Sequence, residues 1–367
     1  MNDTRTGVIV AGRYRLEGRL RQGPVSSLYA GTDLETGRRV AARVFDAVPV
    51  EDVDVHAGAE PLLNLDSPHL ARLFAAERAP DGVPVLVEGA IAGESLPDRL
   101  TRQPLALREV ARVLDGLLEA LAYCHGQGVL HRDVRPENVF LTGAGPRLTV
   151  QLRGAGQAAI FSNRATPTLG GVAYGNPLFT APEQWVNRSV DASTDLYAVA
   201  ALGYLLLTGR SLIEPGLPFE VCRRHFTAPR PLPQTTAVGE PIPTALAEVL
   251  RRAASAERAA RFVTAEAMRE ALAEAAATLD SDAPLRFEAV AFEVDDISFN
   301  VEVSILEEIP LEAGLTEQVI EDMTCELPSV AGFGVGHLAS TVEMLLPDIS
   351  PDELAEIEAM PDDTLED

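Results

Sequence analysis

Short β-rich runs dominate the first 95 residues of the chain. Apolar and β-branched residues gather in brief segments that Gly and Pro interrupt, a pattern typical of strands joined by turns. The predicted strands cover residues 12–20, 28–33, 39–45, 70–77 and 83–88. This part of the chain therefore predicts a small β-rich lobe.

Beyond residue 93 the period of the apolar positions becomes helical. Residues 107–125 carry one apolar stripe, made of Val110, Val113, Leu114, Leu117, Leu118 and Leu121. Residues 196–207 are an apolar run of 12 residues, which is shorter than the roughly 18 to 20 needed to cross a bilayer and predicts a buried helix. Residues 264–279 repeat the helical spacing. Strands followed by helices predict an α+β fold of two lobes with a cleft between them.

Residues 278–367 differ from the rest of the chain in charge. They contain 24 Asp and Glu against one arginine, whereas residues 1–277 contain 31 acids and 29 arginines. Alternation over residues 285–305 predicts a β-hairpin, and Ser350 to Glu353 form a capping box that predicts a short helix. This acidic appendage is expected to bind a protein partner with a basic surface, or to be a solvated tail. Its charge disfavours nucleic acid as a partner.

The composition limits the cellular compartment and the catalytic mechanisms that we expect for this chain. All 30 basic residues are arginine, so no mechanism in this chain can use a lysine. The three cysteines, Cys124, Cys222 and Cys325, form no CxxC motif, which favours a reducing compartment. Residues 1–12 lack the apolar segment of an export signal. We therefore expect a cytoplasmic protein without a membrane partner.

Several segments resemble bacterial Ser/Thr protein kinases of the eukaryotic type, in the order that the family has them. The strongest is HRDVRPENVF at residues 131–140, which is similar to the catalytic loop. The others are YRLEGRLRQGPVSSLYAG at 14–31, VAARVF at 40–45, GESL at 93–96, GNPLFTAPEQ at 175–184, DASTDLYAVAALGYLLLTG at 191–209 and AERAARF at 256–262. The resemblance implies a protein-kinase-like fold with an N-lobe at 12–92 and a C-lobe at 93–277. An extension, 1–11, precedes it and the acidic tail, 278–367, follows it.

The resemblance assigns two catalytic positions and a nucleotide slot. Asp133 matches the carboxylate that orients the substrate hydroxyl, and Asn138 matches the metal-binding amide. Leu28, Ala41 and Phe140 match the residues that sandwich adenine, although they could equally be core residues. Of the glycines in the phosphate-covering loop only Gly23 remains.

Other catalytic positions depart from the family pattern. Arg43 stands at the lysine position, and its planar fork does not replace a compact ammonium. Gly58 falls at the position of the glutamate that pairs with this lysine, and Glu60 lies two residues away, on another face of the helix. Gly154 replaces the aspartate that would hold magnesium. A gapless alignment puts Glu88 at the gatekeeper position, where a carboxylate would repel an anion.

The residues that support the scaffold match the family. Glu183 and Arg261 match a buried ion pair. Asp195 matches the residue that binds the backbone of the catalytic loop, and Arg132 is the arginine of the HRD motif. The sequence therefore keeps the scaffold and loses much of the chemistry.

Three functions are consistent with these residues. The first is a pseudokinase, a regulatory or scaffolding binding module with little or no phosphotransfer. The second is an active ATP-dependent Ser/Thr kinase that uses Arg43, Asn138, ATP and magnesium in an atypical site. The third is a switch that binds ATP without transferring phosphate. An Asp or Glu from another part of the chain that takes the place of the acid missing at Gly154 would favour the second function, the active kinase.

Overall fold

The structure is a computed structural model that describes residues 5–23, 26–45, 54–102, 104–161, 168–169, 172–173, 175–185, 189–216, 218–228, 230–237, 239–277 and 279. The chain divides into the units Met1–Thr324 and Cys325–Asp367, and all described residues lie in the first. The hairpin predicted at 285–305 and the helix predicted from Ser350 lie outside the described residues.

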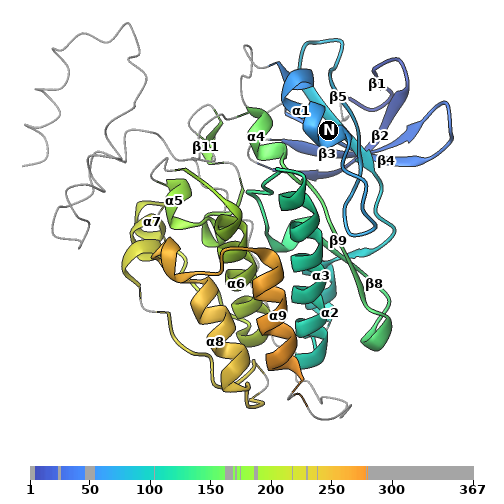
Figure 1. Ribbon diagram of the computed structural model, residues 1–367. Helices are drawn as coiled ribbons and strands as arrows, with labels where there is room; N and C mark the ends of the chain where they lie inside the picture. The colour runs from blue at the N-terminus through green and yellow to red at the C-terminus, as the bar shows by residue number, and fades with distance from the viewer. Residues whose placement is uncertain are drawn as a thin grey trace, which may run out of the picture. The chain divides into compact units, whose positions relative to one another are not determined.

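An antiparallel sheet forms the first lobe (Figure 1). Within the described residues its strands run in the order β1-β2-β3-β4-β6-β5. They are Ile9–Val10 (β1), Tyr14–Gln22 (β2), Ser27–Asp33 (β3), Arg39–Val44 (β4), Leu73–Arg78 (β5) and Pro84–Gly89 (β6). The five strands predicted from the sequence overlap β2 to β6. Buried and half-buried side chains alternate along β3, whereas the central strand β4 is buried almost throughout.

The helix Val55–Leu63 (α1) packs against β5 of this sheet. The Asp54 carboxylate caps it by accepting a hydrogen bond from the Ala57 N–H at 3.0 Å. Val55, Ala59 and Leu62 are its buried residues, and their helical spacing explains why one face of α1 joins the core.

Helices dominate the second lobe (Figure 1). The 20-residue helix Leu107–Gly126 (α3) packs against Ala192–Thr208 (α6) and Ala265–Ala276 (α9), and the predicted apolar stripe of α3 is fully buried. Nearly every residue of α6 is buried, which confirms the predicted core helix. The remaining helices are Leu96–Arg102 (α2), Gln157–Phe161 (α4), Pro182–Trp185 (α5), Pro218–Thr227 (α7) and Thr244–Ala253 (α8), with 3-10 turns at Pro136–Asn138 (η1), Gly145–Arg147 (η2), Pro177–Phe179 (η3) and Arg258–Ala260 (η4).

A small sheet at the start of the second lobe positions the predicted site. Its strands are Glu94–Ser95 (β7), Val139–Thr142 (β8) and Thr149–Leu152 (β9), and Thr168–Leu169 (β10) pairs separately with Val172–Ala173 (β11). The turn η1 leads into β8, and Arg153 follows β9. The Arg153 N–H donates to the Asn138 carbonyl at 2.8 Å, so the antiparallel register brings the catalytic-loop motif beside Gly154.

The predicted α+β arrangement of a β-rich lobe and a helical lobe is confirmed. Among the described residues, every helix is too short or too polar to span a bilayer.

Candidate functional site

Five of the seven residues predicted to be catalytic or nucleotide-binding surround one cavity of about 500 Å³. Strands β2 to β4 line one side of it, and residues from β7 to β9 and the turns beside them line the other. Gly23, Leu28, Arg43, Asn138 and Phe140 all reach the cavity, whereas Ala41 is buried within the sheet and does not. The full lining is Leu20, Arg21, Gly23, Ser26, Leu28, Arg43, Ser95, Pro97, Asp98, Arg135, Glu137, Asn138, Phe140, Arg153 and Gly175.

Asp195, at the start of α6, fixes the backbone of the HRD motif. Its buried carboxylate accepts hydrogen bonds from the N–H groups of His131 at 2.8 Å and Arg132 at 2.7 Å. These two bonds hold Arg132 at φ +63°, a backbone conformation that is uncommon for a residue with a side chain. The loop geometry therefore depends on a carboxylate that lies 63 positions after Arg132 in the chain.

The structure brings Asp133 and Asn138 together. The Asn138 amide nitrogen donates to the carbonyl of Asp133 at 2.8 Å and to its carboxylate at 2.9 Å. The guanidinium of Arg135 lies 3.1 Å from the other oxygen of that carboxylate. Asp133 is buried and does not itself line the cavity, and it is held in an ion pair with Arg135, a partner that the sequence did not predict.

Gly154 lies beside Asn138, where the metal-binding acid would be expected. A side-chain Cβ built at Gly154 would come within 3.9 Å of the Asn138 amide nitrogen, so the two positions face each other. The backbone of Gly154 has φ +85°, which disfavours any other residue. Magnesium requires oxygen ligands, usually carboxylates. Gly154 brings no carboxylate to the position that faces the Asn138 amide, so the donor set at this position does not fit magnesium.

A buried ion pair replaces the apolar interior of the predicted nucleotide slot. The Glu88 carboxylate is 2% exposed and lies 3.6 Å from the Arg153 guanidinium. It also accepts hydrogen bonds from the Gly154 N–H at 3.1 Å and the Gln157 side chain at 2.7 Å. Burial raises the pKa of Glu88, and the charges of Arg153 and Arg43 and these two hydrogen bonds oppose that shift.

This ion pair changes the interpretation of two predicted residues. The Arg153 guanidinium carbon lies 4.5 Å from the centre of the Phe140 ring, which would otherwise form the floor of an adenine slot. From the sequence alone, Glu88 was expected to repel an anion. In the structure its charge is paired with Arg153. The sequence did not predict the role of Arg153, because its partner Glu88 lies 65 positions away in the chain. Its place directly before Gly154 is the one feature of the sequence that could have indicated it.

Arg43 lines the cavity without a partner for its buried nitrogen. The residue is 9% exposed, and its Nε has no hydrogen-bond partner among the described residues. The helix positions considered for its counterion supply none, because Gly58 has no side chain and Glu60, which was expected to lie on another face of the helix, is exposed. A Cβ on Gly58 would approach Ile160 of α4 to 3.2 Å, so α4 packs on α1 where a glutamate would stand.

Comparisons with known proteins agree with this two-lobed fold and its motifs. The family model described as "Protein kinase domain" matches residues 14–270. The chain belongs to the protein kinase family. It is 31% identical over 267 residues to the serine/threonine-protein kinase Pkn1 of Myxococcus xanthus, covering 71% of this chain and 38% of that protein. It is also 30% identical over 286 residues to the serine/threonine-protein kinase PknL of Mycobacterium bovis, covering 74% and 68%.

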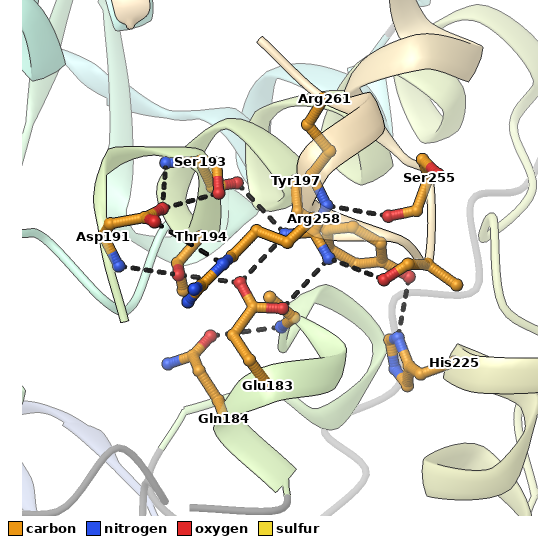
Figure 2. A network of polar contacts seen from close by, with 12 residues as sticks. Glu183, Gln184, Asp191, Ser193, Thr194, Tyr197, His225, Ser255, Arg258 and Arg261 are labelled. Atoms are coloured by element: carbon orange, nitrogen blue, oxygen red, sulfur yellow. Dashed lines mark hydrogen bonds and ion pairs between the residues drawn. The ribbon is translucent and has the colours of Figure 1, made fainter. Parts of the chain in front are cut away.

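The kinase domain contains a second polar centre away from the cavity (Figure 2). The Arg261 side chain is fully buried and forms two 2.9 Å hydrogen bonds with the Glu183 carboxylate of α5. Arg261 also donates to the Ser255 carbonyl, and Glu183 accepts a hydrogen bond from Thr194 of α6 at 2.7 Å. The ion pair thus joins α5, α6 and the segment that precedes α9.

His225 of α7 belongs to the same centre and makes the stability of the kinase domain depend on pH. One ring nitrogen lies 2.8 Å from the Tyr197 hydroxyl (Figure 2). The other lies 2.8 Å from the Pro177 carbonyl oxygen. Burial lowers the pKa of His225 to about 3, the bond to Pro177 opposes this shift, and the nearby Arg230 and Arg261 charges add to it. The neutral ring donates to the carbonyl and accepts from the hydroxyl.

We expect a histidine in this environment to destabilise the domain as the pH falls below about 6.5, where the unfolded chain takes up a proton and the folded one does not. Between pH 7 and pH 5 the unfolding free energy should fall by about 2 kcal/mol more in the wild type than in His225→Gln. Urea unfolding of both proteins across this range measures the difference. Parallel pH profiles would contradict the assigned protonation state.

Proposed function

We propose that this member of the protein kinase family is catalytically impaired and acts as a regulatory or scaffolding binding module. The observation that supports it most is Gly154, which brings no carboxylate to the position facing Asn138. Phosphoryl transfer depends on metal ions that neutralise the phosphate charge, and on a cation that is held in place. Here the metal ligands are reduced to an amide, and Gly58 stands at the helix position whose glutamate would pair with Arg43.

An active Ser/Thr kinase with an atypical site is the second candidate. Asp133 and Asn138 support it, since their hydrogen-bonded arrangement is the part of the site that the family uses for the substrate hydroxyl and the metal. Glu88 is the carboxylate nearest to the Gly154 backbone, but Arg153 and two hydrogen bonds already engage it. The relatives are named as kinases, and this chain spans 38% of Pkn1 and 34% of pkn2 of the same bacterium.

The acidic residues 278–367 extend the proposal to a partner. Their charge suits a protein with a basic surface, and the lack of cysteine motifs suits the cytoplasm. Apart from Leu279, these residues lie outside the described part of the structure, and their charge is the feature that supports a basic partner.

A titration with ATP, with and without magnesium, distinguishes the two candidates. We expect no magnesium-dependent binding at millimolar ATP, and no phosphotransfer to a generic acceptor protein above the level of Asp133→Asn. Calorimetry measures the binding, and radiolabelled phosphate measures the transfer. Magnesium-dependent binding together with transfer that Asp133→Asn abolishes would contradict the impaired site and establish an active kinase.

A further inference from the structure

The cavity is lined by more cations than acids. Four of its lining residues, Arg21, Arg43, Arg135 and Arg153, are arginines, against two acids, Asp98 and Glu137. Its volume of about 500 Å³ falls within the roughly 300 to 1,000 Å³ that small-molecule pockets have. The chain therefore offers a ligand-sized space in which guanidinium groups are the main polar feature.

Two of these arginines have counterions in the protein. Arg135 lies 3.1 Å from Asp133 and 3.8 Å from Glu137. Arg153 lies 3.6 Å from Glu88. The first pair lies beside the catalytic loop, and the arginine of the second lies beside the Phe140 ring.

Arg43 is different from both. The difference is that it forms no ion pair within 4.0 Å with any described residue. Its buried Nε, like that of Arg153, also lacks a hydrogen-bond partner among the described residues. Glu88 is its nearest source of negative charge, yet that carboxylate is already held by Arg153, Gly154 and Gln157. A buried cation is costly unless an anion and hydrogen-bond acceptors accompany it. An anion inside the cavity would supply both.

The neighbouring residues define which anion fits. The guanidinium of Arg153 covers the Phe140 ring, so a nucleobase would find a cation on the aromatic face that it would stack against. The Gly154 position offers no carboxylate to a divalent metal. An arginine guanidinium can donate two parallel hydrogen bonds to the oxygens of a phosphate, and this contact needs no metal ion.

We infer that the cavity binds a phosphate-bearing anion without a divalent cation, with Arg43 as its main contact and without a contribution from a nucleobase. The inference rests on the proposed function, because it takes the site as one that does not hold a magnesium nucleotide. The same chemistry is offered by an inorganic polyphosphate and by the triphosphate of a nucleotide, and the test separates these two sources.

The experiment is calorimetric titration of the full chain with sodium tripolyphosphate, ATP and adenosine, each in EDTA and in magnesium. In EDTA we expect tripolyphosphate and ATP to bind with affinities within about threefold of each other, and adenosine not to bind. Magnesium should weaken the binding of both phosphates, because it neutralises the charge that the arginines recognise and finds no carboxylate at the Gly154 position. A higher salt concentration should also lower the affinity for tripolyphosphate and ATP.

Two variants of Arg43 test the assigned contact. Arg43→Gln should lower the tripolyphosphate affinity at least tenfold, and Arg43→Lys, which keeps the charge and loses the fork, should lower it about threefold. The matched control is Arg251→Gln, whose side chain is 47% exposed on α8 and should leave the affinity unchanged. Thermal unfolding of each variant verifies that it is folded.

The outcomes separate the inference from the proposed function. If the folded wild type does not bind tripolyphosphate, or if Arg43→Gln binds it as tightly as the wild type does, the inference is wrong and the impaired kinase remains. Adenosine binding as tight as that of ATP would overturn the exclusion of the nucleobase. Magnesium-dependent ATP binding with transfer that Asp133→Asn abolishes would overturn both.

Discussion

Replacing Arg261 with alanine is expected to lower the free energy of unfolding by about 3 to 5 kcal/mol, the usual cost of leaving one partner of a buried ion pair uncompensated. The Arg261 side chain has no exposed area, and Glu183 would lose both of its 2.9 Å hydrogen bonds in the variant. The guanidinium carbon also lies 4.8 Å from the Tyr197 ring centre, so packing is lost together with charge. Urea unfolding followed by circular dichroism measures the change.

An exposed ion pair of the same domain provides the matched control. Arg251 and Glu248 of α8 lie 2.7 Å apart, with side chains 47% and 43% exposed. Arg251→Ala should cost less than about 1 kcal/mol, because water screens such pairs. In a double-mutant cycle, Glu183→Ala combined with Arg261→Ala should cost clearly less than the two single changes added together. A loss below 1 kcal/mol for Arg261→Ala would contradict the role given to this pair.

The placement of Glu183 and Arg261 shows what the sequence could predict. Each lies in a segment that resembles the family, so the pairing follows from the resemblance although 78 positions separate them. The strands and the two long helices followed from local periodicity, because one face of each is buried. Segment patterns and family motifs together therefore predicted the fold and the scaffold contacts.

The interior of the cavity could not be predicted in the same way. The ion pair joins Glu88, at the predicted gatekeeper position, to Arg153, to which the resemblance assigned no role, so no family motif predicts it. The packing of α4 on α1 depends on Gly58 and Ile160, and a glycine in a helix gives no signal of what will cover it. These contacts form because several positions, such as Gly58 and Glu88, differ from the family at once. A comparison made one residue at a time shows each difference only as the loss of a family residue.

Replacing Asp195 with alanine is expected to cost about 3 to 5 kcal/mol of unfolding free energy, because hydrogen bonds to a charged group contribute roughly 1.5 to 3 kcal/mol each. The variant leaves the buried N–H groups of His131 and Arg132 without their acceptor, and it releases Arg132 from φ +63°. Asp115→Ala is the matched control, since Asp115 forms a 2.6 Å ion pair with Arg269 but is 44% exposed. That control should cost less than about 1 kcal/mol.

The pH dependence of unfolding tests the same contacts of Asp195 without removing its side chain. Burial alone would raise the pKa of this carboxyl, but hydrogen bonds and charge from His125, the charge of His131 and the Arg132 N–H bring it below its usual value. A lowered pKa means that the charged form stabilises the fold above about pH 4, and that this contribution is lost as the pH falls through the folded value. The stability advantage of the wild type over Asp195→Asn should therefore be constant near pH 6 and narrow below pH 4 in urea unfolding. An advantage that stays constant down to pH 3 would mean that the carboxylate charge does not hold the loop, and that the shape of the side chain is sufficient.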